Sequence, residues 1–277
     1  MLKSMVLILI LLLTYSNMAL AQQIGVPSEI EELAFRGVAA NADWEPYALE
    51  FNEVEMVLVP AGCFDMGDDP QAFFWFGSEW IQGVPEGGKQ CFEEPFWIDR
   101  YEVSNGQFER FGGISQQNSR WTDDHNPRES ISWFEAASFC TLREARLPTE
   151  AEWEFAARGP DGLAYPWGND FVASHVVYLD NAENQTAPVG SRPDNASWVG
   201  ALDLAGNVSE WVRTLYHDYP YSISDEKESA DNTLGVRMIR GGSWRESNDQ
   251  VLRSSTRDGY DEDLRTYDVG FRCMRPY

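Results

Sequence analysis

The chain has 277 residues, and its 45 Asp and Glu side chains outnumber 21 Lys and Arg, which leaves a formal net charge of −24. A charge of this sign disfavours electrostatic binding to nucleic acid or to an anionic membrane surface. Because 43% of the residues are apolar and 11 are tryptophan, we expect a folded globular protein rather than a disordered acidic chain.

The first 21 residues have the pattern of a secretory signal peptide. Lys3 precedes an apolar run from Val6 to Leu13, and the small-residue tripeptide Ala19–Ala21 follows. The run is too short for a membrane-spanning helix, which needs about 20 apolar residues. The sequence therefore predicts cleavage after Ala21, a secreted or periplasmic protein, and no stable membrane insertion.

Export determines how the cysteines are interpreted. In an oxidising compartment, an even number of cysteines favours disulfides over free thiols. Three pairings are possible from the residues alone. The four cysteines are Cys63, Cys91, Cys140 and Cys273.

The mature chain begins with a Glu-rich segment, residues 22–53, which we interpret as a leader or loosely docked segment. The apolar runs Met56–Pro60 and Phe96–Val103 predict two strands. Residues 68–90 lie between them and mix Gly, Pro and aromatic residues, so a long loop is expected there. Residues 54–277 are expected to form one domain.

Three helix starts carry a capping box, in which a Ser or Thr and a Glu or Gln three residues later satisfy backbone N–H groups reciprocally. These pairs are Ser104 with Gln107, Ser132 with Glu135, and Thr149 with Glu152. Beyond the third helix, turn-rich sequence contains short strand runs at Arg237–Arg240 and Val269–Cys273. The pattern predicts an α+β domain with few regular elements and much ordered loop.

Seven sequence strings in order resemble the formylglycine-generating enzyme family, also called sulfatase-modifying factors, over about residues 54 to 276. The resemblance implies an irregular α+β fold related to C-type lectins. It also implies that Cys140 pairs with Cys273, while Cys63 and Cys91 bracket the long first loop and are expected to pair. The strings are Met56–Gly62 with Met66-Gly67, Glu102–Asn105, Arg146–Glu154, Tyr165–Asn169, Gly206–Trp211, Arg240–Trp244 and Gly270–Cys273.

The resemblance does not extend to the copper ligands of the oxidising members. In those proteins, two cysteines just beyond the Arg-Gly-Gly-Ser string bind copper(I). Here Glu246 stands at the first position and the second falls near Val251. Thiolates select copper(I), and a carboxylate is a hard ligand that does not replace them. We therefore expect no copper and no formylglycine-generating oxidase activity.

The string from Asp203 to Glu210 resembles a calcium site of the family. The resemblance implies ligation by Asp203, by the carbonyls of Gly206 and Val208, and by Glu210, a set of hard oxygens that suits calcium. The spacing alone favours a tight turn with solvated acids. The resemblance also points to a second calcium site that begins at Asn181 and the Ala182 carbonyl.

The resemblance places the substrate cleft near residues 243–257. This stretch suits an acidic or peptide ligand, or supplies acid–base groups, although Arg253 and Arg257 can equally be paired with acids as scaffold. No role is assigned to the three scattered histidines, His125, His175 and His217. The cleft candidates are Ser243, Trp244, Glu246, Arg253 and Arg257.

Three functions are compatible with these residues. The first is an exported, calcium-stabilised pseudoenzyme that binds an unknown peptide, protein or small-molecule ligand. The second is an enzyme of different chemistry, such as the periplasmic oxidation in siderophore chromophore maturation in which some cysteine-lacking relatives take part; Glu246 is its residue-level support. The third is a lectin-like carbohydrate binder that uses calcium directly.

Overall fold

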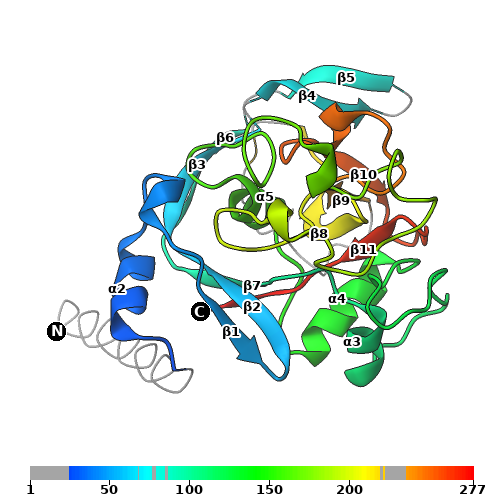
Figure 1. Cartoon of the computed structure of the whole chain (residues 1–277), viewed down its shortest axis with the longest axis horizontal. Coiled ribbons are helices and arrows are strands. Elements are labelled where there is room, and N and C mark those ends of the chain that lie inside the picture. Colours follow the sequence, from blue (N-terminus) through cyan, green and yellow to red (C-terminus); the bar gives the residue numbers. More distant parts are fainter. Residues whose placement is uncertain (1–24, 68, 77–78, 85–86, 219–220, 222–234) are drawn as a thin grey trace.

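The computed structural model describes residues 25–277 except 68, 77–78, 85–86, 219–220 and 222–234, and for residues 69–84 only the backbone. The predicted signal peptide lies outside the described residues. Short helices and strands alternate with long irregular segments (Figure 1). The helices are α2 (Ser28–Arg36), α3 (Asn105–Arg110), α4 (Trp133–Leu142) and α5 (Glu150–Arg158), with the 3-10 turns η1 (Asn41–Asp43), η2 (Ala173–His175), η3 (Pro193–Asn195) and η4 (Asp249–Leu252).

The strands form two four-stranded sheets and two ribbons. The first sheet has the order β1-β2-β7-β12 and is antiparallel; the second has the order β10-β9-β8-β11, in which β8 and β11 run parallel. The ribbons are β3–β6 and β4–β5. The strands are β1 (Ala48–Phe51), β2 (Val54–Val59), β3 (Gly62–Met66), β4 (Asp69–Phe76), β5 (Glu79–Val84), β6 (Gly88–Phe92), β7 (Phe96–Asp99), β8 (Ser209–Leu215), β9 (Val236–Arg240), β10 (Asp258–Asp261), β11 (Val269–Phe271) and β12 (Met274–Pro276).

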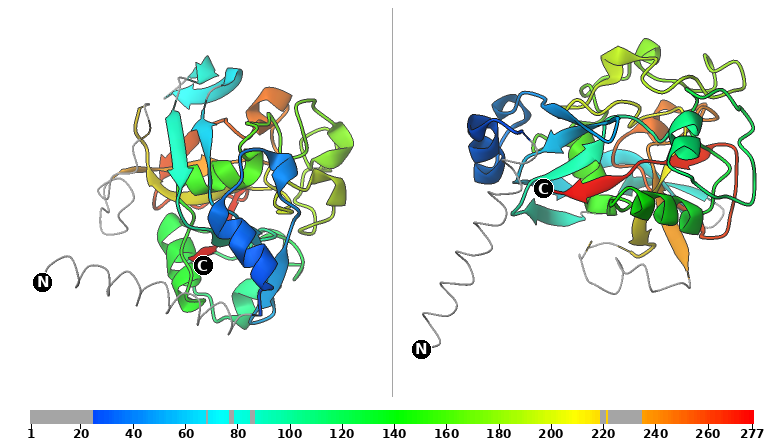
Figure 2. Two further views of the ribbon diagram at one scale, coloured as in Figure 1. Left: turned by 90° about the vertical axis from the view of Figure 1, so that its left-hand side faces the viewer. Right: turned by 90° about the horizontal axis from the view of Figure 1, so that it is seen from below.

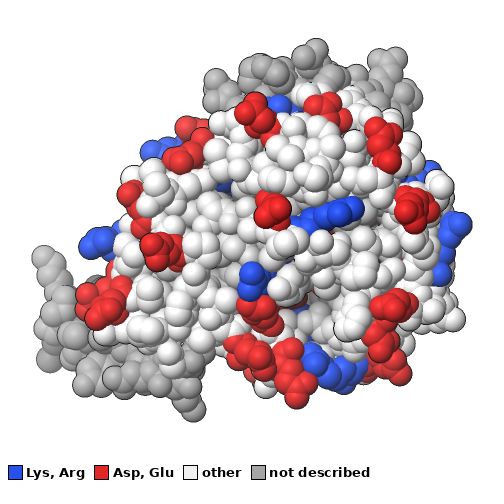
Figure 3. Space-filling model, viewed as in Figure 1, with Lys and Arg blue, Asp and Glu red and all other residues white. Residues whose placement is uncertain are grey.

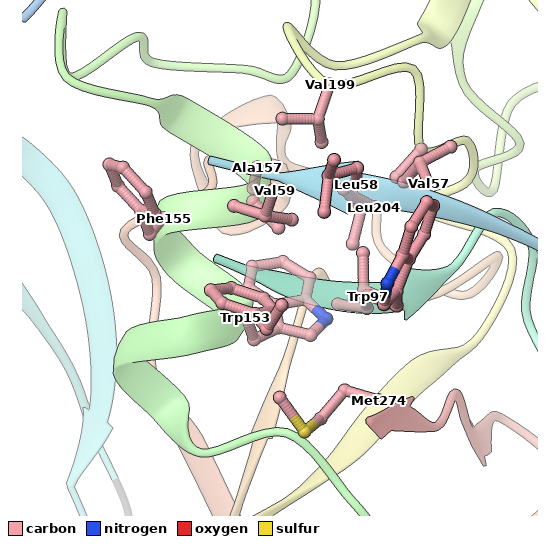
Figure 4. Close-up of a cluster of buried hydrophobic side chains, with 14 of the residues drawn as sticks. Val57, Leu58, Val59, Trp97, Trp153, Phe155, Ala157, Val199, Leu204 and Met274 are labelled. Carbon is pink, nitrogen blue, oxygen red and sulfur yellow. The ribbon is translucent and has the colours of Figure 1, made fainter. Parts of the chain in front are cut away.

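Helix α5 lies at the centre of the larger hydrophobic core. All nine of its residues are buried, and Figure 4 shows its side chains beside those of β2 and β7. The indole of Trp198 donates a hydrogen bond to the Phe155 carbonyl at 2.8 Å, which attaches an irregular segment to the helix. A helix buried on all sides is held by tertiary packing rather than by its own propensity.

The predicted helix caps are present. Ser132 and Thr149 each form a complete capping box with the Glu three residues later, and the Ser104 hydroxyl accepts a hydrogen bond from the Gln107 N–H at 3.2 Å. Helix α4 places Cys140 in the second core cluster, fully buried. These local signals therefore predict α3, α4 and α5 correctly, whereas α2, which has no side-chain cap, was not predicted.

The predicted domain boundary at residue 54 is too late. Strand β1 pairs with β2 in antiparallel register from Ala48 opposite Val57 to Phe51 opposite Val54, so it is an edge strand of the first sheet. Trp44 is buried in the same core. The segment before residue 54 is part of the domain because its apolar side chains complete that core.

The long loop expected at residues 68–90 is largely strand. Strands β4 and β5 form a ribbon, and β6 returns to pair with β3. Figure 1 shows the β4–β5 ribbon at the top of the molecule, and its strand β4 contacts η4 and β10. Both of these elements carry residues of the candidate site.

The end of the chain closes against helix α2. Figure 2 shows the C-terminus beside α2 in both views, and the ring of Tyr277 lies 5.0 Å from that of Phe35 in an edge-on contact. Strand β12 also pairs with β7, with Met274 opposite Ile98. The C-terminal residues therefore hold the first sheet and α2 together.

Charge is distributed rather than gathered on the face that Figure 3 shows. Acidic side chains stand singly or in small groups among Lys and Arg. This pattern is typical of a solvated surface.

Candidate functional site

Two consecutive glycines after β9 direct the chain into the candidate site. Gly241 and Gly242 have φ angles of 92° and 65°, a region that side chains with a Cβ rarely adopt. A Cβ on Gly241 would lie 3.2 Å from the Trp153 ring, and one on Gly242 would lie 3.0 Å from Leu252. The chain then reaches Glu246, which lines one cavity with Ser209 of β8, Arg240 of β9 and Asp258 of β10.

Glu246 lines a small cavity that holds a second carboxyl group, that of Asp258. The cavity has a volume of about 20 Å³, enough for one water molecule, and Ser209 and Thr256 also line it. Burial, followed by the neighbouring carboxylates of Asp258 and Asp268, raises the pKa of Glu246 to about 7. Burial likewise raises the pKa of Asp258 to about 6. A carboxyl with a pKa near 7 exchanges its proton close to neutral pH, as acid–base chemistry requires.

Replacing Glu246 by glutamine is expected to flatten the pH dependence of stability. A raised pKa in the folded state gives stability that is complete below about pH 4.5 and is lost as the pH rises through about 7. In the parent protein, titration of Glu246 should therefore lower the free energy of unfolding between about pH 5 and about pH 8. Glu246→Gln should lack this contribution, so its free energy of unfolding should fall by roughly 1 to 3 kcal/mol less over the same range. Urea denaturation across this range measures the difference.

Asp263→Asn, a change at an exposed carboxyl away from the cavity, is the matched control and should not reproduce the flattening. Superimposable profiles for Glu246→Gln and the parent protein would show that Glu246 does not titrate as an enclosed carboxyl.

Three aromatic rings and two arginines lie beside this cavity. Trp121, Trp244 and Tyr267 contact one another, with ring centroids 5.4 to 6.1 Å apart. Arg120 and Arg245 both lie over the ring of Tyr267. Arg245 directly precedes Glu246 in the chain, and its charge acts on the Glu246 carboxyl, so this group of residues neighbours the cavity.

The structure separates the predicted cleft residues. Trp244 and Glu246 belong to the site, whereas Ser243 is buried and its hydroxyl accepts a hydrogen bond from the Arg245 N–H at 3.3 Å. Arg253 lies over the ring of Tyr165, 5.6 Å from its centroid. Neither Ser243 nor Arg253 lines the cavity that Glu246 and Asp258 share.

Arg257 belongs to a buried ion-pair network rather than to the cleft. It contacts both oxygens of Glu150, at 2.6 and 2.8 Å, and Arg240 joins the same carboxylate at 2.9 Å. Burial alone would raise the pKa of Glu150, but Arg257 and Arg240 outweigh it and lower the pKa. The structure therefore shows Arg257 paired with an acidic residue as part of the scaffold.

The residues predicted to bind calcium lie in a buried cluster of carboxylates around Arg272. Both oxygens of Glu210 contact the Arg272 guanidinium at 2.7 Å, and the Trp153 indole also donates to Glu210 at 2.8 Å. Asp203 accepts hydrogen bonds from the Gly190 N–H and the Asn195 amide. These contacts occupy oxygens that would face a metal ion.

Glu102 is a third member of this cluster and was not selected as a site residue from the sequence. It accepts hydrogen bonds from the Val208 N–H and the Asn207 amide. Burial, followed by the neighbouring Asp203 and Glu210, raises the pKa of Glu102 well above its usual value, and burial also raises the pKa of those two. Three buried carboxyl groups thus lie near one guanidinium, and their oxygens are the kind of donor that a calcium ion takes.

The geometry of a preformed metal site is not present. Within the described part of the chain, no three His, Cys, Asp or Glu side chains are arranged to hold a metal ion. The oxygen donors and the charge fit calcium, but binding through Glu210 would require Arg272 to share or release that carboxylate.

Asn181 and Ala182, the proposed start of a second calcium site, stabilise a loop. The Asn181 side chain donates to the carbonyls of Ala173 and Val176 at 2.9 Å and accepts from the Tyr178 N–H at 3.0 Å. Its polar atoms are therefore already bonded within the loop.

All four cysteines of the chain are in disulfides. Cys63 pairs with Cys91 across the β3–β6 ribbon, and Cys140 on α4 pairs with Cys273. This is the pairing expected above. The structure therefore holds no thiolate at the cavity.

The cavity partner Asp258 and the neighbouring Asp268 were not selected from the sequence. Both follow the cleft stretch without any ligand-like spacing, and their proximity to Glu246 arises from β10 and the segment before β11. The pairing of β10 with β9, with Asp258 opposite Ile239, is the signal that places Asp258 there.

Residues 42–277 match the sulfatase-modifying factor enzyme 1-like domain, and the chain belongs to this family. The inactive Cα-formylglycine-generating enzyme 2 of Bos taurus is 36% identical over 162 residues, which cover 53% of this chain and 49% of that protein. The hercynine oxygenase of Mycolicibacterium thermoresistibile is 29% identical, with coverage of 84% and 56%. The chain thus spans about half the length of these two relatives.

Solved structures show the same fold. PvdO from Pseudomonas aeruginosa superimposes with a TM-score of 0.66 at 23% identity, covering 84% of this chain and all of that one. CarF superimposes with a TM-score of 0.57 at 19% identity, covering 81% and 98%. The family fold and the α+β class expected from the sequence are confirmed.

Among the described residues, no helix is long and apolar enough to cross a membrane.

Proposed function

We propose that this protein is an exported member of the family that lacks the copper-dependent oxidase activity and acts as a binding or accessory protein through the site around Glu246. The observation that carries this proposal is that all four cysteines are in disulfides while a carboxylate, Glu246, stands where the resemblance puts the first copper ligand. Copper(I) selects thiolates over carboxylates. The bovine relative named as inactive has a similar family domain.

Copper(I) titration tests the proposal. The purified, non-reduced protein should remove no copper(I) from a colorimetric chelator under anaerobic conditions, because no free thiol is available to bind it. The same protein reduced under denaturing conditions is the control, since its four thiols should compete for the metal. One equivalent of copper(I) held by the non-reduced protein would overturn the proposal.

Disulfides also support export, because thiols in the cytosol are kept reduced. Cys140 and Cys273 are both fully buried, and formation of their bond would require an environment that permits oxidation during folding. This agrees with the signal peptide that the sequence predicts at residues 1–21.

An enzyme of different chemistry is the second candidate. It is favoured by the enclosed pair Glu246 and Asp258, whose raised pKa values lie where acid–base catalysis operates at neutral pH. Siderophore chromophore maturation is the reaction that we would test first. A host strain that carries Glu246→Gln should accumulate the unoxidised chromophore, and a strain with normal siderophore absorbance would remove this candidate.

We also propose that calcium binds near Asp203 and Glu210, where its role would be structural because both carboxylates are buried. The group of three buried carboxyls beside Arg272 supports this proposal. Removing calcium with a chelator should lower the melting temperature, because a ligand at 100 times its Kd stabilises the native state by about 2.7 kcal/mol. Asp203→Asn should lose most of this response. An unchanged melting temperature in calcium-free buffer would refute the site.

A further inference from the structure

The aromatic–arginine cluster, formed by Arg120, Trp121, Trp244, Arg245 and Tyr267, has a composition suited to a ligand. Trp244 is only 6% exposed and anchors the cluster, whereas Trp121 and Tyr267 are half-buried and present part of their rings to solvent. Aromatic side chains contribute large apolar contact areas, and because they have only two rotatable side-chain bonds they lose little conformational entropy on binding.

Two guanidinium groups converge on one ring of the cluster. The guanidinium carbons of Arg120 and Arg245 lie 4.6 and 5.1 Å from the Tyr267 ring centroid. A guanidinium that packs over a ring retains N–H groups for a carboxylate, which it can contact in bidentate fashion. The ring therefore holds two cationic donors in place.

The two arginines differ in how they are compensated. Arg245 pairs with Asp268 through Nη1 at 3.1 Å, and its side chain is 47% exposed. The Arg120 side chain is exposed, and in the part of the chain that the structure describes no oxygen accepts a hydrogen bond from its guanidinium. The cluster thus holds two guanidinium groups, of which that of Arg245 is paired with Asp268 and that of Arg120 has no acidic partner in the described part of the chain.

We propose that the aromatic–arginine cluster binds a small aromatic carboxylate, with Arg120 and Arg245 holding the carboxylate and Trp121 and Tyr267 contacting the aromatic body. This proposal rests on the proposed function of the site as a ligand-binding cleft. It assigns the chemical class of the ligand, which the family membership leaves open.

Three probes separate the contributions of charge and ring. N-acetyl-L-tyrosine carries both features, N-acetyl-L-tyrosine amide lacks the charge, and N-acetyl-L-alanine lacks the ring. Isothermal titration calorimetry at low ionic strength should show the first probe binding about tenfold or more tightly than either of the others. Added salt should weaken its binding, because the site is partly exposed.

Arg120→Gln is the main variant, because it removes the uncompensated guanidinium without breaking a described ion pair. It should weaken N-acetyl-L-tyrosine binding about tenfold and leave the amide unaffected. Arg245→Gln should have a similar effect. Arg275→Gln is the matched control: Arg275 also lies over a ring, 4.8 Å from the Phe51 centroid, but belongs to the other sheet and should change nothing.

Equal affinity for the acid and the amide, no heat of binding for the acid, or an effect of Arg275→Gln as large as that of Arg120→Gln would each overturn the proposal. Thermal unfolding of each variant verifies that it is folded. These outcomes are independent of copper(I) binding, so a failure of this proposal is distinguishable from a failure of the proposed function.

Discussion

Replacing Arg272 by methionine is expected to destabilise the folded protein by about 3 to 5 kcal/mol, the range for removing one partner of a buried ion pair. Arg272 is fully buried and contacts both oxygens of Glu210. Its positive charge lowers the pKa of Glu102, Asp203 and Glu210, in each case against the larger effect of burial. Without the guanidinium, the carboxyl groups of Glu102, Asp203 and Glu210 would remain together in the interior without the cation that pairs with Glu210. Chemical denaturation at pH 7 measures the loss.

The destabilisation should shrink as the pH is lowered. In Arg272→Met the pKa values of the three carboxyls rise further above their usual range, so acidification protonates them and removes the buried negative charge. Stability that depends on a raised pKa is present at low pH and lost as the pH rises through the folded-state value. Glu210→Gln combined with Arg272→Met should recover part of the loss at neutral pH.

Arg110→Met is the control for Arg272. Arg110 pairs with Glu53 at 2.9 Å, but the two side chains are 42% and 74% exposed, so its loss should cost less than about 1 kcal/mol. A cost below about 1 kcal/mol for Arg272→Met as well would show that the buried carboxylates do not depend on this arginine.

Removing the Cys140–Cys273 disulfide is the second large effect that we expect. The double variant Cys140→Ala, Cys273→Ala should lose about 2 to 5 kcal/mol, because this bond joins residues 133 positions apart and its loss frees the unfolded chain. Both cysteines lie in the second core cluster, so their truncation also leaves space there. Denaturant unfolding of the double variant measures the loss.

The Cys63–Cys91 disulfide provides the comparison. It joins residues only 28 positions apart, so the chain-entropy model gives about 3.6 kcal/mol for it and about 5 kcal/mol for Cys140–Cys273. Cys63→Ala with Cys91→Ala should therefore cost less. Non-reducing peptide mapping of the parent protein provides an independent check, and a Cys63–Cys140 peptide would contradict both predictions.

Helices α3, α4 and α5 were predictable because their signals are local, whereas α2 lacks a side-chain cap and was missed. The pairs Ser132 with Glu135 and Thr149 with Glu152 cap helices within four residues of chain, and no distant contact is needed to recognise them. Strand β8 was missed because six of its seven residues are buried, which removes the alternation of polar and apolar residues that marks a half-exposed strand.

The site was predictable only in part. Glu246 was found through its position after the Arg-Gly-Gly-Ser string, whereas its cavity partner Asp258 is brought close by the pairing of β10 with β9. The charge of Arg257 suggested a cleft residue, but its ion pair with Glu150 in the structure identifies it as a scaffold residue. Sequence spacing does not separate these two roles.

The absence of oxidase chemistry is the central claim, and conversion of a cysteine-containing sulfatase peptide tests it most directly. The non-reduced protein is incubated with the peptide, oxygen and copper, and the aldehyde is measured by mass spectrometry beside an active member of the family. Because Cys63, Cys91, Cys140 and Cys273 are all in disulfides, we predict no aldehyde above the level without protein. Copper-dependent formation of formylglycine above that level would contradict the account.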